Sequence, residues 1–509
     1  MKLARIIEGL DIINVSGDPY GEVSAVCFSA DKCKQGSLFV AIPGLKNDGH
    51  DFITEAIACG AQFIVYEKNL QFPSQVTAIK VSDSRRALSI LAKNYFDNPS
   101  GQLVLVAVIG TNGKTTITYL LESILKAASF KCGVLGTVNY RYNDKTCPAP
   151  NTTPESYELQ KIMREMADGG VTHVIAEVSS HAVDLKRVED CDFDLGVFTN
   201  LTRDHLDYHL TMENYFQAKK RFFAEVLPQS KKVHSQKMVI NTDDQWGQRI
   251  LREVSLPALT YGIEGDCAIM AKNYKLSLAG IKVRIDLGGE TVSIASPLIG
   301  KFNLYNILAA VGAAVILQVP SPVIKRGIEN LFCVPGRLER VASPEGVNIF
   351  VDYAHTDDAL RRVLQSLVEL KKKRIITVFG CGGNRDRGKR PLMGEAATRY
   401  SDLTIITSDN PRLEDPMTII VEIEEGIDGG KIKKTESDNL ICKGDTHCYT
   451  VIPERRKAIE VAIDAAESGD IILIAGKGHE DYQILGTQKI PFDDRVVVTQ
   501  TLKLRSHIQ

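Results

Sequence analysis

Short apolar runs alternate with segments of helical spacing along most of this 509-residue chain. The clearest pair lies near residue 110. A continuous apolar run from Leu103 to Ile109 predicts a fully buried strand of a parallel sheet. After a polar loop, apolar residues recur at helical spacing, which predicts a helix: Ile117, Leu120, Leu121, Ile124 and Leu125. A buried strand that leads into a helix is the repeating unit of α/β proteins.

The same pattern divides the chain into three predicted domains, in keeping with about 150 residues per domain. Residues 1–98 predict a small α/β domain, and the polar stretch 97–101 has linker composition. Residues 99–335 predict a central nucleotide-binding domain with a parallel sheet. Its alternating segments between Leu259 and Ser296 predict a small attached antiparallel sheet.

Residues 336–509 predict a third domain built as a doubly wound parallel sheet. Apolar strands alternate there with helical segments, at 349–353, 375–379, 403–407 and 471–475. Such sheets bind ligands at the carboxyl ends of their strands. Arg385 and Arg412 each lie just past a strand, and a guanidinium can bind a carboxylate through two hydrogen bonds. The polar segment 431–446 predicts a surface excursion.

Composition narrows the function. The formal net charge of −2 argues against a broad nucleic-acid-binding face but permits a local basic pocket. The longest apolar run, Leu308 to Leu317, has about half of the ~20 residues needed to cross a bilayer, so we expect no membrane insertion. The eleven cysteines lack CxxC pairs. They predict reduced thiols and a cytoplasmic location, and they argue against a zinc site.

The loop between the first strand and its helix has the residues of a phosphate-binding loop, in GTNGKTT at 110–116. Free backbone N–H groups and the helix dipole favour phosphate at a helix N-terminus. Lys114 would reach the outer phosphates, and the Thr115 hydroxyl would hold Mg²⁺. Val108 occupies the position of the first glycine in GxxxxGK[ST]. The alternative is a glycine turn with an incidental Lys-Thr, but strand, turn and helix coincide in the required order.

Two further strand ends carry residues suited to chemistry. Glu177 ends an apolar strand, where a carboxylate is a suitable partner for a phosphate-bound Mg²⁺. The strand 195–199 leads into a loop that holds His205 among several acidic, amide and imidazole groups. This density at the end of a strand indicates binding or catalysis, although a single histidine is more often structural.

Motifs in one order along nearly the whole chain resemble those of the Mur ligases, ATP-dependent enzymes that add amino acids to the UDP-N-acetylmuramoyl peptide of the cell wall. They are GTNGKTT (110–116), EVSSHA (177–182), TNLTRDHLDYH (199–209), LIGKFNLYN (298–306), DYAH (352–355), GCGGNRD (380–386), DNPR (409–412) and GKGHE (476–480). The resemblance implies that ATP phosphorylates a substrate carboxylate and that an amine attacks the acyl phosphate.

The family pattern implies roles for individual residues. Thr115 and Glu177 would serve one Mg²⁺ ion, and His205, Glu177 and a carbamylated Lys219 would serve the second. Lys114 would join Glu177, His205 and Lys219 as a catalytic residue. The nucleotide would contact Gly110, Thr111, Asn112, Gly113, Lys114, Thr115, Thr116, Asn303, Arg337, Asp352 and His355.

DNPR resembles the type that adds meso-diaminopimelate to UDP-N-acetylmuramoyl-L-alanyl-D-glutamate. The UDP-linked substrate would then contact Ser29, Asn151, Thr152, Thr153, Ser179, Arg187 and Lys219. The amino acid would contact Arg385, Asp409, Asn410, Pro411, Arg412, Gly476 and Glu480. The chain departs from the family in two places: Phe28-Ser29-Ala30 replaces Asp-Ser-Arg, and Asp357 replaces a proline.

Three alternatives remain. A folylpolyglutamate-synthetase-like ligase shares a similar phosphate loop but needs neither the first domain nor DNPR. A lysine-adding Mur ligase would differ in the amino-acid site. A nucleotide-binding protein without catalysis is disfavoured because Glu177, His205 and Lys219 occur together. We expect a monomer.

Overall fold

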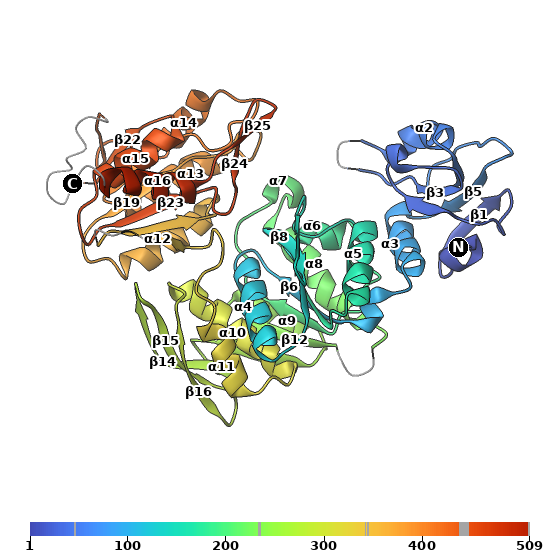
Figure 1. The fold of residues 1–509 in the computed structure, drawn as a ribbon, viewed down its shortest axis with the longest axis horizontal. Coiled ribbons are helices and arrows are strands. Elements are labelled where there is room, and N and C mark those ends of the chain that lie inside the picture. The colour runs from blue at the N-terminus through green and yellow to red at the C-terminus, as the bar shows by residue number, and fades with distance from the viewer. Residues whose placement is uncertain (45–46, 233–235, 342, 344–345, 437–446, 507–509) are drawn as a thin grey trace.

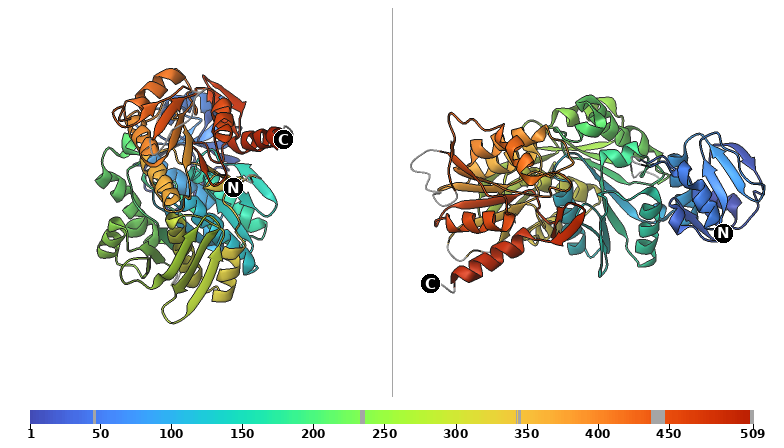
Figure 2. Two further views of the ribbon diagram at one scale, coloured as in Figure 1. Left: turned by 90° about the vertical axis from the view of Figure 1, so that its left-hand side faces the viewer. Right: turned by 90° about the horizontal axis from the view of Figure 1, so that it is seen from above.

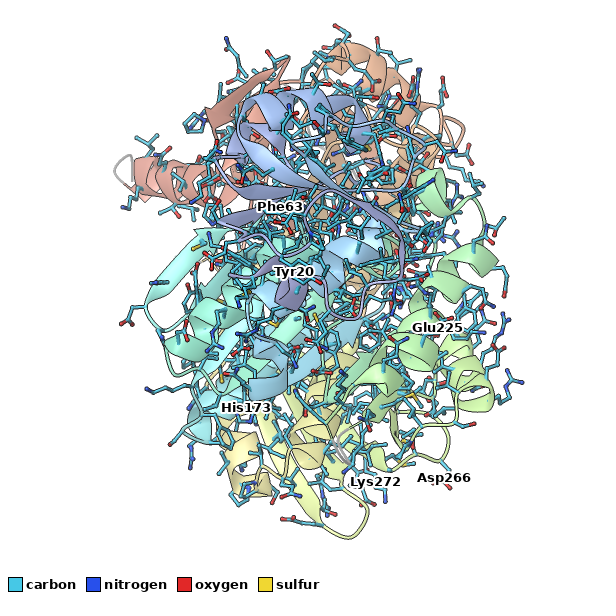
Figure 3. The ribbon with its side chains drawn as sticks, turned by 90° about the vertical axis from the view of Figure 1, so that its right-hand side faces the viewer. Tyr20, Phe63, His173, Glu225, Asp266 and Lys272 are labelled. Atoms are coloured by element: carbon cyan, nitrogen blue, oxygen red, sulfur yellow. The ribbon has the colours of Figure 1, made fainter. Side chains whose placement is uncertain are left out.

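The computed structural model describes residues 1–44, 47–232, 236–341, 343, 346–436 and 447–506, and these form an α/β protein with three large sheets. The N-terminal part lies at one end, the central part in the middle and the C-terminal part at the other end (Figure 1, Figure 2). Figure 3 looks from the N-terminal end and places Tyr20 and Phe63 in front of the central part. The predicted fold class is confirmed.

The N-terminal sheet has the strand order β1-β5-β4-β3-β2, with β1 antiparallel to β5 and the other pairs parallel. Helices α1 and α3 pack on one face and α2 on the other. The elements are α1 Leu3–Ile6, β1 Ile12–Ser16, β2 Ala25–Cys27, β3 Ser37–Val40, α2 Ile53–Ala58, β4 Ala61–Tyr66, β5 Thr77–Val81 and α3 Ser84–Tyr95.

The central sheet has the order β16-β15-β14-β13-β12-β11-β6-β10-β7-β8-β9. Its strands are β6 Val104–Ile109, β7 Cys132–Leu135, β8 Asn139–Tyr142, β9 Lys145–Pro148, β10 His173–Val178, β11 Leu195–Phe198, β12 Lys237–Asn241, β13 Ala258–Gly262, β14 Ile269–Ser277, β15 Gly280–Asp286 and β16 Thr291–Ser296. Alternate side chains of β6 enter opposite cores, Val106 beneath α4 and Ala107 beneath α5. The strand is therefore apolar throughout, as predicted.

The helices of the central part are α4 Lys114–Ala127, α5 Ser156–Asp168, α6 Ser180–Asp184, α7 Leu206–His209, α8 Met212–Arg221, α9 Gln245–Glu253, α10 Lys301–Ile316 and α11 Ser321–Glu329. The attached antiparallel strands predicted between Leu259 and Ser296 are present as β14, β15 and β16. β13 pairs in parallel with both β12 and β14, so the antiparallel strands extend the main sheet. Pairing at the sheet edge satisfies backbone groups that would otherwise remain open.

The C-terminal sheet has the order β17-β18-β23-β19-β20-β22-β21, and a hairpin of β24 and β25 stands apart from it. Helices α12, α13 and α14 cover one face, and α15 and α16 cover the other. The elements are β17 Glu339–Val341, β18 Asn348–Asp352, α12 Asp357–Val368, β19 Ile375–Phe379, α13 Lys389–Tyr400, β20 Leu403–Ile406, α14 Pro416–Glu424, β21 Lys433–Lys434, β22 Cys448–Val451, α15 Arg455–Asp464, β23 Ile471–Ala475, β24 Tyr482–Leu485, β25 Gln488–Pro491 and α16 Asp494–Ser506.

Three sequence expectations concern the chain as a whole. Within the described residues, no helix is long and apolar enough to cross a membrane. Among the residues that the structure describes, nine cysteines carry free thiols, whereas Cys448 is disulfide-bonded, so the prediction of reduced thiols was wrong there. Most of the predicted surface excursion at 431–446 lies outside the described residues.

Candidate functional site

The phosphate loop joins the end of β6 to the start of α4, as predicted. Gly113 precedes the helix with a φ of +90°, and a side chain at Gly110 would come within 1.8 Å of the Thr199 hydroxyl oxygen. Both positions therefore need glycine. The turn directs the first N–H groups of α4 toward the space above the loop, which is the geometry of an anion site.

Lys114 already uses its ammonium group within this loop. Its Nζ donates to the backbone oxygens of Gly110, at 3.0 Å, and of Thr111, at 2.9 Å. Burial lowers the pKa of Lys114, while the carboxylate of Glu177 opposes that shift. A bound phosphate would supply the charge that these neutral carbonyl groups lack.

Glu177 lies at the end of β10 and is 1% exposed. Its Oε2 accepts hydrogen bonds from the hydroxyl groups of Thr115, at 3.1 Å, and Thr137, at 2.9 Å. Its Oε1 accepts one from the backbone N–H of Thr137. The strand end thus holds a carboxylate directly beside the hydroxyl that follows Lys114, as the sequence predicted.

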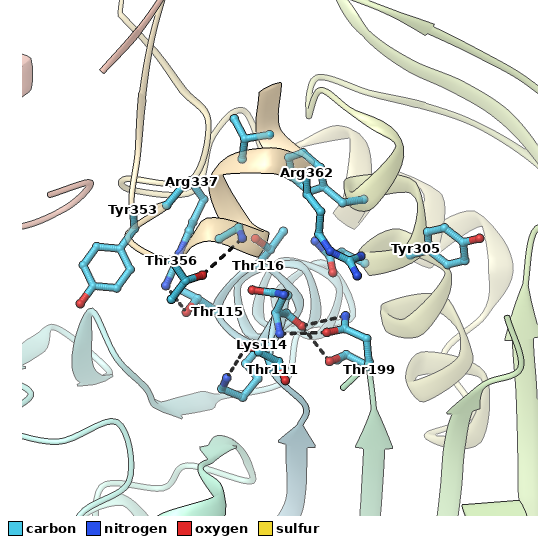
Figure 4. A pocket seen from close by; sticks show the side chains of 18 of the residues that line it. Thr111, Lys114, Thr115, Thr116, Thr199, Tyr305, Arg337, Tyr353, Thr356 and Arg362 are labelled. Carbon is cyan, nitrogen blue, oxygen red and sulfur yellow. Dashed lines mark hydrogen bonds between the residues drawn. The ribbon is translucent and has the colours of Figure 1, made fainter. Parts of the chain in front are cut away.

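These groups face a cavity of about 550 Å³ between the central and C-terminal parts. Arg337 Nη2 donates to the Thr115 hydroxyl at 3.1 Å, and Asn112 Nδ2 donates to Asp358 Oδ2 at 3.2 Å. In Figure 4, Arg337 and Arg362 lie on the opposite wall from Lys114. The predicted residues that line the cavity are Thr111, Asn112, Gly113, Lys114, Thr115, Thr116, Thr152, Glu177, Ser179, His205, Arg337, Asp352 and His355.

Asn303 is placed differently from our expectation. It is 2% exposed and does not line the cavity, and its Nδ2 donates to the backbone oxygen of Ile299 at 2.8 Å. Its Oδ1 accepts from Asn306, which does line the cavity. Asn303 therefore supports Asn306, one helical turn farther along α10, and sequence reasoning missed Asn306.

Asp352 and His355 shape the C-terminal wall. Asp352 accepts hydrogen bonds from the backbone N–H groups of Leu338 and Ala354, so its carboxylate holds a turn. Burial, together with the charge of Lys389, lowers the pKa of His355 to about 4. The imidazole is therefore neutral at pH 7, and its Nδ1 lies 2.8 Å from the Tyr353 backbone oxygen, to which it donates.

Lys219, on α8, is 1% exposed, and its Nζ donates to the backbone oxygen of Gly110 at 2.9 Å. Burial, with the charge of Lys114, holds its pKa well below the usual range. Lys219 therefore loses its proton more easily than an exposed lysine, and carbamylation requires that unprotonated form, because only it is nucleophilic.

His205 occupies a left-handed backbone position, with a φ of +53°, and its side chain is 45% exposed. Its Nε2 lies 3.5 Å from Asp204 Oδ2. Within the described chain, no hydrogen bond or ion pair joins His205 or Lys219 to Glu177, and no group of three or more His, Cys, Asp or Glu side chains is placed to hold a metal ion. Asp204 lines the cavity and was missed, although its loop was noted for its acidic residues.

The predicted contacts of the UDP-linked substrate gather behind Glu177. Thr153 donates to the Glu177 backbone oxygen at 2.8 Å and accepts from the Ser179 N–H at 3.1 Å. Arg187 Nη1 donates to the Thr153 backbone oxygen at 3.1 Å. The Asn151 backbone oxygen accepts from the Tyr140 hydroxyl. These residues therefore form one polar group that adjoins the cavity.

A carboxylate connects this group to the N-terminal part. Glu155 lies 3.3 Å from Arg187 Nε and 3.4 Å from Nη1 of Arg85, which also donates twice to the Pro43 backbone oxygen. Sequence reasoning missed both Arg85 and Glu155. Ser29 lies in the N-terminal part, outside the cavity, and its hydroxyl donates to Asp31.

The predicted amino-acid residues gather beside the hairpin β24–β25. Arg412, with a φ of +54°, donates from Nη1 to the Gly383 backbone oxygen at 2.8 Å. Burial and the nearby charge of Arg385 lower its pKa. Asn410 Nδ2 donates to Glu480 Oε2 at 2.9 Å. Asp409 and Pro411 flank Asn410 in the chain, Gly476 lies close to Asp409, and Arg385 is exposed to solvent.

Lys477 was missed although the GKGHE motif was noted. It is 0% exposed, and its Nζ lies 3.2 Å from Glu480 Oε2, 3.3 Å from Asn410 Oδ1 and 3.6 Å from Asp409 Oδ1. A fully buried lysine needs paired charges, so a lysine inside a glycine-rich ligand motif was a usable signal.

The fold and the phosphate-loop cavity define an ATP-binding-type α/β enzyme, and comparison with known families agrees with this class. Three family descriptions match in chain order: the Mur ligase family catalytic domain at residues 22–96, the Mur ligase middle domain at 108–314 and the Mur ligase glutamate ligase domain at 336–478. The chain belongs to the Mur ligase family.

Relatives carry more specific names. A Geobacter metallireducens protein named UDP-N-acetylmuramoyl-L-alanyl-D-glutamate--2,6-diaminopimelate ligase is 45% identical over 501 residues, 98% of each chain. A solved structure with the same name has a TM-score of 0.70 at 31% identity, covering 100% of this chain and 99% of its own. A Mycobacterium tuberculosis folylpolyglutamate synthase complexed with ADP shares the fold, with a TM-score of 0.61 at 17% identity over 83% of this chain and 94% of its own.

Proposed function

We propose that this protein is the ATP-dependent ligase that adds meso-diaminopimelate to UDP-N-acetylmuramoyl-L-alanyl-D-glutamate in peptidoglycan synthesis. The observation that carries the proposal is the near-complete overlap with the Geobacter ligase, over 98% of both chains. The folylpolyglutamate synthase covers less of this chain at lower identity, and that likeness concerns the fold alone.

The reaction forms a peptide bond in two steps. The substrate carboxylate attacks the γ-phosphorus of ATP, giving an acyl phosphate and ADP. The amine of diaminopimelate then attacks the carbonyl carbon, and the tetrahedral intermediate releases phosphate and a proton. Lys114 and the N–H groups at the start of α4 hold the phosphates, and their charge favours the transferring phosphoryl group.

The residues beside Lys114 fit a magnesium ion. Thr115 Oγ1 and Glu177 Oε2 are 3.1 Å apart, about the separation of neighbouring oxygen ligands around an octahedral ion with bonds of about 2.1 Å. Bound there, Mg²⁺ would neutralise phosphate charge. Thr115 and Glu177 would hold this ion, and Arg337 would keep the Thr115 hydroxyl in place from the opposite wall.

Lys219 would carry a carbamate for a second Mg²⁺. Its neutral Nζ would attack carbon dioxide, forming a carbon–nitrogen bond and releasing a proton. The new carboxylate would lie next to the phosphate loop, because Nζ already contacts the Gly110 backbone oxygen. His205, which lines the same cavity as Glu177, would share this ion with it.

The substrates would occupy the three predicted domains. Residues 1–98 would hold the UDP end through Ser29, residues 99–335 would bind ATP and the peptide end, and residues 336–509 would bind the amino acid. Arg412 and Arg385 supply the cations that the distal carboxylate of diaminopimelate requires and that lysine does not. We place the enzyme in the cytoplasm as a monomer.

The test is ATP-dependent phosphate release by the purified protein with the UDP-linked dipeptide and each amino acid. We expect rapid release with meso-diaminopimelate, a product heavier by the added amino acid, and at least about 10³-fold slower release with L-lysine. Comparable rates with both amino acids would overturn the assignment, and faster release with L-lysine would favour the lysine-adding alternative.

A further inference from the structure

The buried ammonium of Lys477 connects residues that lie far apart in the chain. It follows β23, and its contacts on Asn410 and Asp409 are reached across 67 or more residues. Its other polar contact within the described part of the chain is Glu480, three residues later, at 3.2 Å. All three partners belong to the proposed amino-acid site.

These contacts give Asn410 and Glu480 a single arrangement. Asn410 Oδ1 accepts from Lys477 and from the backbone N–H of Ile484, at 2.9 Å, so the amide can present only its NH₂ group to Glu480. Glu480 Oε2 then accepts from both Asn410 and Lys477. The Asn410 amide also holds the hairpin strand β24 through the N–H of Ile484. The backbone of β24 therefore helps to fix the orientation of the Asn410 side chain.

The charges around Lys477 do not balance. Asp409 and Glu480 carry two carboxylates, whereas Lys477 supplies one ammonium between them. Asp409 Oδ1 is buried and makes no hydrogen bond within the described residues. Arg412 and Arg385 supply positive charge on the neighbouring side. Two carboxylates thus share the single ammonium of Lys477, beside the positive charges of Arg412 and Arg385.

We propose that Lys477 is a positioning residue, which holds Asn410 and Glu480 ready for the distal ammonium group of the amino acid. This inference rests on the proposed function and deepens it. The distal end of diaminopimelate carries one ammonium and one carboxylate, which complement the charges of the site. Lysine lacks the distal carboxylate, and 2-aminopimelate lacks the distal ammonium.

The test measures a specificity ratio, kcat/KM for meso-diaminopimelate over kcat/KM for 2-aminopimelate, in one enzyme sample. This ratio does not depend on the fraction of folded protein. In Lys477→Met we expect the ratio to fall at least about tenfold through a higher KM for diaminopimelate, with the KM for ATP within about twofold of the unmodified enzyme. Lys489→Met is the matched control, because Lys489 lies over the same Tyr482 ring but is exposed.

The outcomes separate this inference from the proposed function. An unmodified enzyme that does not use diaminopimelate overturns both. Normal ligation with an unchanged ratio in Lys477→Met, whatever its stability, overturns the positioning role alone. Should Lys477→Met fail to fold, the ratio is measured in Lys477→Gln, which keeps an N–H donor without the charge. A fall of the specificity ratio by the same amount in Lys477→Gln supports the proposal, and an unchanged ratio in that variant rejects it.

Discussion

The phosphate loop and the amino-acid site are built in opposite ways. The phosphate loop is one stretch, Gly110 to Thr116, between a strand and a helix, and its shape follows from two glycines and a helix start. The proposed amino-acid site combines Arg385, the DNPR loop, the GKGHE loop and a hairpin. One site depends mainly on local backbone geometry, and the other depends on long-range contacts between side chains.

The comparison makes the phosphate loop the region most sensitive to a single substitution. We expect Lys114→Ala to lower kcat by about 10³-fold or more, because its ammonium offsets charge on the transferring phosphoryl group. Steady-state phosphate release measures this, and circular dichroism checks the fold. Lys126→Ala is the control, on the same helix but paired with Glu122 at the surface. Near-normal turnover in Lys114→Ala would place the phosphates elsewhere.

Lys219 is expected to have the next largest effect. Lys219→Ala should lower kcat by about 10²-fold, with partial rescue by added acetate or formate, because a carbamate supplies a carboxylate at that position. The mass of the intact enzyme and electron density at Nζ test the adduct directly. The control is Lys220→Ala, which should stay active because Lys220 pairs with Glu253 and makes no contact with the phosphate loop in the described structure. An unmodified ammonium in a metal-loaded crystal would contradict this prediction.

The amino-acid site should respond in KM rather than in kcat. Arg412→Ala removes a partly buried cation and should raise the KM for diaminopimelate about 100-fold, the equivalent of one charged hydrogen-bonded pair. The KM for ATP should stay within about twofold. Arg387→Ala is the control, since Arg387 pairs with Glu422 on the surface. An equal rise in the KM for diaminopimelate and in the KM for ATP would show that the amino-acid site and the phosphate loop do not act independently.

The smallest effect is expected in the N-terminal part. Ser29→Ala should raise the KM for the UDP-linked substrate about fivefold, the cost of one neutral hydrogen bond. The same initial-rate assay, with the UDP-linked substrate varied, measures it. Ser24→Ala, whose hydroxyl donates to Gln35 in the same part, should change nothing. An unchanged KM in Ser29→Ala would remove Ser29 from the site.

Local construction explains what the sequence predicted well. The strand before Gly110, the helix after Gly113 and the pairing of Thr115 with Glu177 all follow from apolar runs and from where they end. The carboxyl ends of neighbouring parallel strands meet at one sheet edge, so the position of Glu177 beside the loop could be predicted from the sequence alone.

Long-range packing explains what the sequence did not predict. Asn303 and Asn306 lie one turn apart on α10, and helical spacing does not say which of them faces the cavity. His205 was predicted and lines the cavity from a left-handed backbone position, and its neighbour Asp204 lines the cavity too, which the pattern of the loop did not indicate. Lys477 meets Asn410 only after β20 and β23 take their places in the sheet, and no local pattern records that contact.

Contacts between the two walls of the nucleotide cavity couple nucleotide binding to the arrangement of the central and C-terminal parts. Arg337 meets Thr115, and Asp358 meets Asn112, so each contact forms only when the walls stand together. Binding and joining are reciprocal. If a bound nucleotide shifts the equilibrium toward the joined walls by some factor, the joined walls bind nucleotide more tightly by the same factor. The apparent dissociation constant is then the intrinsic one divided by the joined fraction. If the walls also separate, a substitution of Asp358 would change nucleotide affinity through the joined fraction, while the phosphate loop keeps its shape.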